Sequence, residues 1–76
     1  MPRKTLYIEG YVVSSNRADT AEEFFRNEPN TKCARLRNGA LLITRNHRSS
    51  ASLAAARDLQ MTLRKYEISF IDISTI

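Results

Sequence analysis

The chain has 76 residues, of which 42% are apolar, and it carries a formal net charge of +4. A chain this short buries only about 60% of the surface that its unfolded form exposes, so it has room for one thin core. Its apolar residues are spread along the sequence, which argues against disorder, and no apolar run approaches the ~20 residues that span a bilayer. We therefore expect a single folded domain over residues 1–76, without a membrane partner, in the cytoplasm of a cell or of a host cell.

The first predicted element is a strand over residues 5–14, where β-branched and aromatic residues alternate. The alternation places Leu6, Ile8 and Val12 on one face, which we expect to pack against the helices. The opposite face would stay open, and it carries four side chains: Tyr7, Glu9, Tyr11 and Val13.

A short helix is predicted next, because Thr20 and Glu23 have the spacing of a capping box. In this motif the hydroxyl and the carboxylate each accept a hydrogen bond from a backbone amide at the start of the helix. The helix would run from Thr20 through Arg26, and Pro29 ends any continuation.

A β-hairpin is predicted around Asn38-Gly39, the pair best suited to the positive φ angles of a two-residue type I′ turn. Its strands would cover residues 31–37 and 40–46, and this closure pairs Leu36 with Leu41. The predicted core face is formed by Ala34, Leu36, Leu41 and Ile43. The other face would be formed by Cys33, Arg35, Arg37, Ala40, Leu42 and Thr44.

A second helix is predicted to begin after a cap at Ser49 or Ser50 and to run through an alanine-rich stretch to about Arg64. Four side chains at helical spacing form the stripe expected to pack on the sheet. They are Leu53, Ala56, Leu59 and Leu63.

The last predicted element is a strand over residues 67–75. Ile68 and Phe70 fall on one of its faces, and Ile71 and Ile73 lean to the other. This pattern predicts either a bulge or a strand that is apolar on both sides.

The element order is therefore strand, helix, strand, strand, helix, strand. This order predicts an α+β fold of the ferredoxin-like, or split βαβ, type, with a four-stranded antiparallel sheet. The first and third strands would be central, and right-handed crossovers would place both helices on one face.

Catalytic and metal-binding functions lack the residues they need. His47 is the only histidine, and no carboxylate lies near it in the sequence. Cys33 is the only cysteine, which excludes an internal disulfide and leaves zinc and iron-sulfur sites without ligands. The sequence also lacks a glycine-rich phosphate loop and a nucleophile elbow. We therefore predict a binding protein that is not an enzyme and holds no metal or cofactor.

The charge distribution predicts a basic side of the molecule, because residues 29–57 contain no acidic residue. Within this stretch, residues 45–50 lead basic side chains into the start of a helix. Helix N-termini and arginine guanidinium groups both favour phosphate, which is consistent with an anion site. Equally, Ser49 or Ser50 could simply cap the helix while the arginines stay in solvent.

The leading functional hypothesis is the binding of nucleic acid. Tyr7 and Tyr11 are expected on the open face of the sheet, and rings beside arginines commonly hold single-stranded nucleic acid. The segment Leu6-Tyr7-Ile8 resembles the aromatic-bearing first strand of RNA recognition motifs, although residues 40–46 lack the glycine and aromatic pattern of that family. The predicted site for single-stranded RNA or DNA, or for a phosphate backbone, comprises Lys32, Arg35, Arg37, Arg45, His47, Arg48, Tyr7 and Tyr11.

The alternative hypothesis is a protein partner. The open face would also carry Val13, Leu42, Ile71 and Ile73, which is more apolar surface than a lone monomer usually exposes. A second copy or another protein could cover it. Such a chain could be a regulator or inhibitor, of viral or mobile-element type, that blocks a host complex which handles nucleic acid.

Overall fold

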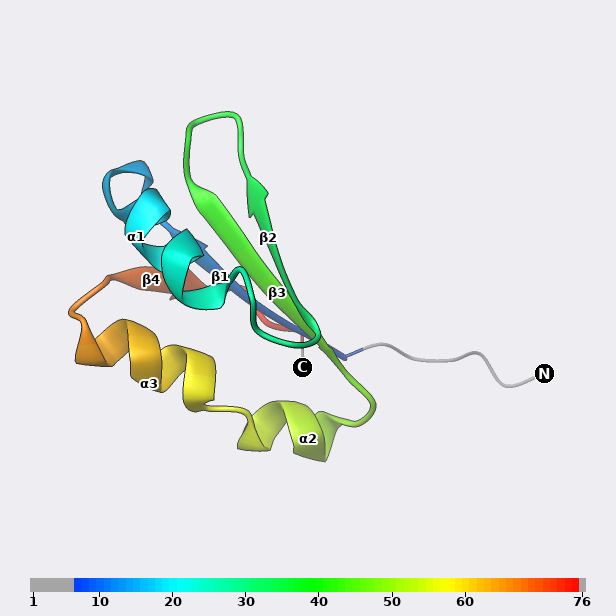
Figure 1. Ribbon diagram of the computed structural model, residues 1–76. Helices are drawn as coiled ribbons and strands as arrows, with labels where there is room; N and C mark the ends of the chain where they lie inside the picture. Colours follow the sequence, from blue (N-terminus) through cyan, green and yellow to red (C-terminus); the bar gives the residue numbers. More distant parts are fainter. Residues whose placement is uncertain (1–6, 76) are drawn as a thin grey trace.

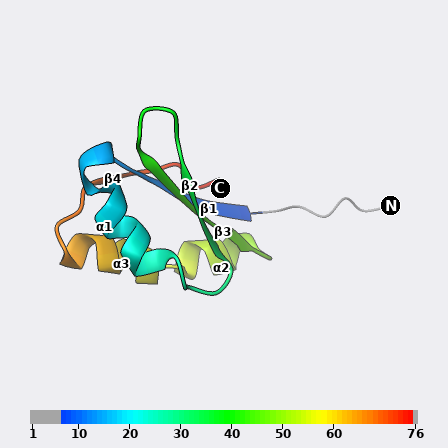
Figure 2. The same ribbon diagram turned by 45° about the horizontal axis from the view of Figure 1, so that its top comes forward.

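The computed structural model describes residues 7–75 as a four-stranded antiparallel sheet with all its helices on one face (Figure 1). The strands are β1 (Tyr7–Val13), β2 (Thr31–Arg35), β3 (Leu41–His47) and β4 (Phe70–Asp72), in the spatial order β2-β3-β1-β4. The helices are α1 (Ser15–Phe25), α2 (Ser50–Ala55) and α3 (Asp58–Lys65). The turned view of Figure 2 shows the three helices on the same side of the sheet.

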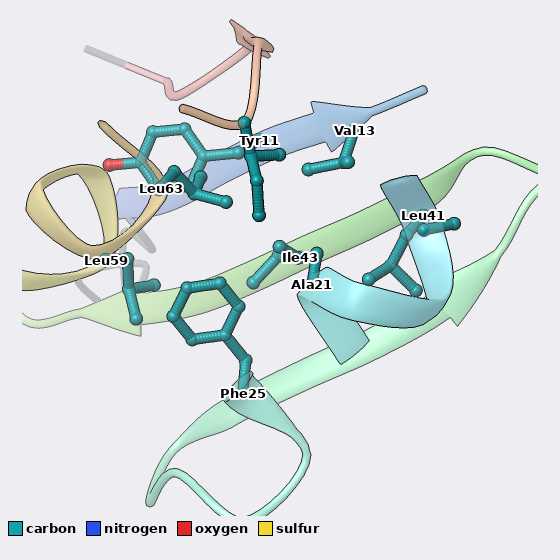
Figure 3. Close-up of a cluster of buried hydrophobic side chains, with 10 residues drawn as sticks. Tyr11, Val13, Ala21, Phe25, Leu41, Ile43, Leu59 and Leu63 are labelled. Atoms are coloured by element: carbon teal, nitrogen blue, oxygen red, sulfur yellow. The ribbon is translucent and has the colours of Figure 1, made fainter. Parts of the chain in front are cut away.

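The ferredoxin-like prediction is confirmed, since β1 and β3 are central and the strands and helices follow the predicted order. The core fills the layer between the sheet and the helices (Figure 3). Ala21 and Phe25 of α1 and Leu59 and Leu63 of α3 contribute to it from the helical side. The sheet contributes Tyr11, Val13, Leu41 and Ile43. Within residues 7–75 no helix is long and apolar enough to cross a membrane.

The predicted orientation of β1 is wrong. Tyr11 and Val13 are buried beneath the helices, whereas Ile8 and Val12 are half-buried and lie on the opposite face. Both faces of this strand are apolar, so the alternation of residues does not show which face packs against the helices. Glu9 lies on the core face and made that face look like the solvent-exposed one. Leu6 and the predicted start of the strand lie outside the described residues.

The hairpin forms, but its loop is one residue longer than predicted. The amide of Leu36 donates to the carbonyl of Ala40 (2.9 Å) and the amide of Gly39 to that of Leu36 (3.0 Å). The loop therefore has three residues, and Gly39 holds its left-handed position with φ 87°.

The longer loop shifts the register of β2 by one residue, which turns its side chains to the opposite faces. Ala34 pairs with Leu42 and Arg35 with Leu41. Cys33 consequently packs against the core, while Ala34 and Leu36, predicted as core residues, are exposed. The predicted core face of β3 is confirmed, because Leu41 and Ile43 are buried, but Ala40, predicted on the opposite face, precedes the strand and is buried as well.

The first helix begins five residues earlier than the capping-box signal indicated. Ser14 occupies the N-cap position, and Thr20 and Glu23 both lie within the helix. The buried residues Ala18, Ala21 and Phe25 share one face at helical spacing, so packing on the sheet extends the helix toward its N-terminus.

The second predicted helix is divided into α2 and α3 at Ala56, whose ψ of 116° is extended. In one continuous helix Leu53 and Leu59 would lie about 120° apart around the axis. The break lets both be buried against the sheet, together with Leu63. The predicted cap is confirmed, since the Ser49 hydroxyl accepts a hydrogen bond from the amide of Ser52 (3.0 Å).

The last strand is shorter than predicted, although its two-sided pattern is confirmed. Ile68 is buried on the core side, whereas Ile71 and Ile73 are exposed on the other side. Beyond β4 the amide of Ile73 donates to the carbonyl of Gly10 (2.9 Å). Two hydroxyls extend this pairing, since Ser74 Oγ accepts from the amide of Gly10 (3.0 Å) and Thr75 Oγ1 from that of Ile8 (2.8 Å).

We predict that Gly39→Val destabilises the domain. A β-branched residue is strained at a φ of 87°, and a Cβ at this position would lie 3.2 Å from the Cβ of Ser15. The free energy of unfolding, measured by chemical denaturation, should fall by about 1–3 kcal/mol. Arg37→Val in the same loop is the matched control, because Arg37 has no positive φ. Equal stability of Gly39→Val and the parent would show that the loop has another conformation.

Candidate functional site

Arg35, a residue of the predicted nucleic-acid site, is held in an ion pair on the helical side of the sheet. The register of β2 turns its side chain toward α1, where it bonds to Asp19 and, at 3.0 Å, to Glu22. These hydrogen bonds, first that of Asp19 and then that of Glu22, raise the pKa of Arg35. Its charge is therefore already neutralised within the molecule.

A buried charged cluster lies beneath α2 and α3, centred on Glu9 of β1. The Glu9 side chain is only 1% exposed. Its Oε1 accepts a hydrogen bond from Nε of Arg45 (2.9 Å) and lies 2.8 Å from Nε2 of His47. Its other oxygen, Oε2, accepts a hydrogen bond from the hydroxyl of Tyr11. Burial, and then this bond to Glu9, raise the pKa of Tyr11.

The cluster also ties the sheet to both short helices. The guanidinium of Arg45 donates two hydrogen bonds to Asp58, the first residue of α3, at 2.8 and 3.1 Å. This bidentate contact raises the pKa of Arg45 and lowers that of Asp58. On the other side of the cluster, Nδ1 of His47 lies 3.2 Å from Oγ of Ser52 in α2.

A hydroxyl, an imidazole and a carboxylate thus stand in series at Ser52, His47 and Glu9, the residue types of a nucleophilic triad. The groups that such a triad would need are, however, engaged in other hydrogen bonds. Arg45 and Tyr11 already bond to the carboxylate. The amide of Ser52, a potential oxyanion donor, is used by the cap at Ser49. We therefore interpret this cluster as the clamp that holds the helices on the sheet.

The sequence contained a signal for this cluster that our predictions missed. Arg45 and His47 lie two and four residues after Ile43, so they share its core-facing side of β3. The register places Arg45 directly opposite Glu9. Alternation along β3 could therefore have placed both basic side chains beneath the helices, where a buried carboxylate is the partner they require.

The opposite side of the sheet is the candidate functional site, and we call it the open face. Its centre is a row of aliphatic side chains that crosses all four strands: Ile71 pairs with Val12, Val12 with Leu42, and Leu42 with Ala34. Ile71 is 65% exposed. The neighbouring row comprises Ile73, Gly10, Thr44 and Lys32.

Close packing within the second row brings Ile73 over the backbone of β1. A Cβ at Gly10 would lie 3.0 Å from Cγ1 of Ile73, so the glycine leaves space for this side chain. Ile73 nevertheless remains 49% exposed, which adds to the apolar surface of Ile71. Within residues 7–75 the open face holds no aromatic ring, because every described aromatic residue lies on the core side, in a helix or next to one.

The structure divides the predicted site residues between the two sides of the sheet. Tyr11, predicted as an exposed stacking residue, is buried, as is Val13, which was predicted at a protein interface. Tyr7 pairs with His47 on the helical side and is half-buried. The open face brings together Lys32, Leu42, Ile71 and Ile73. Arg37 and Arg48 are exposed at the two ends of the β2-β3 hairpin, and neither forms an ion pair within residues 7–75.

Cys33 and the remaining titratable groups offer no metal centre in the described part of the chain, where no three His, Cys, Asp or Glu side chains are placed to hold an ion. Burial, and secondarily Glu22, raise the pKa of the Cys33 thiol, which disfavours the reactive thiolate. Comparisons of the chain with models of protein families, with curated proteins and with solved structures give no match.

We predict that Glu9→Ala destabilises the domain strongly, because it removes the buried acceptor of Arg45 Nε and of the Tyr11 hydroxyl and leaves Arg45, which is 14% exposed, with Asp58 alone. Breaking a buried ion pair costs about 3–5 kcal/mol. The whole free energy of unfolding for a chain of this length is roughly 4–11 kcal/mol. Denaturation followed by circular dichroism should therefore show that the variant has lost much of its stability. Glu23→Gln, which removes the exposed pair with Arg26, is the control and should change stability little. A small effect of Glu9→Ala would contradict the role of the clamp.

A second prediction concerns pH and Asp58, whose pKa is held below the ordinary value of 3.8 by hydrogen bonds from Arg45. A depressed pKa contributes stability that is complete above the unfolded value and is lost as the pH falls through the folded value. Asp58→Asn should therefore be less stable than the parent at pH 7 and should lose less stability between about pH 5 and pH 2. The Asp58 side chain is 66% exposed, so high salt should reduce the difference at pH 7. Parallel pH profiles of unfolding for the two proteins would contradict this assignment.

Proposed function

We propose that this protein is a non-enzymatic binding module that docks on a protein partner through the open face of its sheet. The observation that carries the proposal is the cross-strand row of Ile71, Val12, Leu42 and Ala34, which no helix within residues 7–75 covers. Contiguous aliphatic surface of this kind is unfavourable in water and is typical of interaction sites. The helices already cover the other face, so this side is the one left for a partner.

The placement of the aromatic and basic residues favours this alternative over the nucleic-acid hypothesis. Stacking of bases requires exposed rings, but Tyr11 is buried and its hydroxyl is bonded to Glu9. Phosphate contacts require free cations, but Arg35 and Arg45 are paired with carboxylates. Lys32, Arg37 and Arg48 stay available for phosphate, so the binding of nucleic acid has to be measured directly.

The compartment proposed for this activity is the cytoplasm of a cell or host cell. The single Cys33 makes no disulfide. The fold therefore depends on packing and on the buried clamp, both of which persist in a reducing environment. Docking through a preformed sheet face would require little rearrangement of the backbone, which suits a small regulator or inhibitor of a larger complex.

We predict that Ile71→Glu abolishes partner binding while Met61→Glu does not. Both side chains are 65% exposed in the free protein, but Met61 lies on α3 at the opposite side of the molecule. The measurement is affinity purification from a nuclease-treated lysate of the native host, with parent and both variants as bait. We expect a defined set of proteins with the parent and with Met61→Glu, and its loss with Ile71→Glu. Equal recovery with both variants would contradict docking through the open face.

A titration with single-stranded RNA and DNA separates the two hypotheses. If Lys32, Arg37 and Arg48 contacted three phosphates, the affinity would fall with salt at a logarithmic slope of roughly −2. We expect only weak binding at low salt. Tight, steeply salt-dependent binding that Ile71→Glu leaves unchanged would favour the nucleic-acid hypothesis over ours.

A further inference from the structure

The open face and the helical side differ sharply in charge. All eight acidic residues of the chain lie within the described part, and none of them is on the open face. By register, Glu9 and Asp72 are on the core side of β1 and β4, and Asp72 accepts a hydrogen bond from Gln60 of α3 (3.3 Å). The others lie in or next to helices: Asp19, Glu22, Glu23, Glu28, Asp58 and Glu67.

Cations, in contrast, border one edge of the open face. Lys32 stands on it, opposite Thr44, at the β2 side. Arg37 lies in the loop of the β2-β3 hairpin, at one end of this edge. Arg48 follows the central strand β3 and lines a hollow with His47 and Ser52 on the helical side. The aliphatic side chains Ile71 and Ile73 lie at the other edge, on and after β4. The face is thus apolar toward β4 and positively charged toward β2.

We propose, resting on the function proposed above, that the partner is a protein surface with an aliphatic centre flanked by acidic side chains that meet Lys32. An apolar centre with a polar rim is the usual anatomy of a protein interface. Complementary charges at the rim raise the association rate and fix the orientation of the partner.

The same features disfavour a second copy of this chain as the occupant. A symmetric dimer packs the same patch against itself, so each face would meet another face that carries lysine and no carboxylate. Lys32 would then find no carboxylate on the other copy, and its charge would stay unpaired in the contact. Nucleic acid would satisfy Lys32, but its phosphates would leave Ile71 and Ile73 without apolar partners.

The test uses a displayed library of small helical scaffolds with randomised surfaces, selected on the parent protein. Selected scaffolds are then purified and titrated against variants by fluorescence anisotropy. We expect the selected surfaces to combine aliphatic with acidic residues. Ile71→Glu should weaken their binding by about tenfold or more, as expected for the centre of an interface. Met61→Glu should leave their binding unchanged.

A matched pair of charge reversals tests the acidic rim. Lys32→Glu should weaken binding by about two- to fivefold, the size of an exposed ion pair, and this difference should disappear in high salt. Arg57→Glu makes the same change in net charge at the junction of α2 and α3, on the helical side, and should have little effect. Denaturation of each variant checks that it is folded.

The outcomes distinguish the two proposals. Binders that depend on Ile71 but lack acidic residues would contradict the inference of an acidic partner surface, and so would equal effects of Lys32→Glu and Arg57→Glu. Neither result would contradict docking through the open face. If sedimentation shows that the parent forms a dimer that Ile71→Glu dissociates, the occupant is a second copy and the inference is wrong. If no binder responds to Ile71→Glu, the inference and the proposed function fail together.

Discussion

The burial of the Glu9 carboxylate is the constraint on which the rest of this structure depends. Removing a carboxylate from water is costly, and here the cost is offset by Arg45, His47 and Tyr11, all of which lie on the core side of the two central strands. Within the described residues no buried side-chain nitrogen or oxygen is left without a hydrogen-bond partner. Asp58 completes the network and anchors α3 at the point where the helical segment breaks.

This constraint also explains why aliphatic residues are exposed. Side chains alternate along a strand, so placing Glu9 and Arg45 beneath the helices turns Val12 and Leu42 to the outside. In most half-covered sheets the polar residues face water and the apolar residues face the core. Here some charges are inside and some aliphatic residues outside, a conflict between local pattern and global fold that is typical of functional surfaces.

The sequence predicted the type and order of the elements well, because those depend on strong local signals. The alternation of β-branched residues, the Asn38-Gly39 pair and the stripe of Leu53, Leu59 and Leu63 were sufficient for the topology. The side of the sheet to which each side chain points was harder to predict. Asn38-Gly39 is compatible with loops of two or three residues, and the difference of one residue reverses every side chain of β2. The two faces of β1 are similarly apolar, and only the distant Arg45 decides between them.

These two reversals account for the positions of two predicted site residues, Tyr11 and Arg35. Tyr11 and Arg35 were assigned to the open side because of the assumed facing of β1 and β2, and both belong to the helical side. Leu42, Ile71 and Ile73 were placed correctly, since the facing of β3 and β4 was right. The side of the sheet predicted for Tyr11 and Arg35 was therefore wrong because the facing of their strands was wrong, whereas the apolar surface of β3 and β4 was predicted on the correct side.

The hydroxyls of Ser74 and Thr75 have a consequence for self-association. An unpaired strand edge is a template on which another chain can add, and repeated addition leads to aggregation. Beyond the short β4, the amides of Gly10 and Ile8 would form such an edge, but each donates to one of these hydroxyls. The amide of Thr75 also donates to the carbonyl of Ile8 (2.8 Å), so residues 73–75 keep this side of β1 paired beyond β4. A central strand next to a bare aliphatic surface therefore offers no free amide here to which another chain could add.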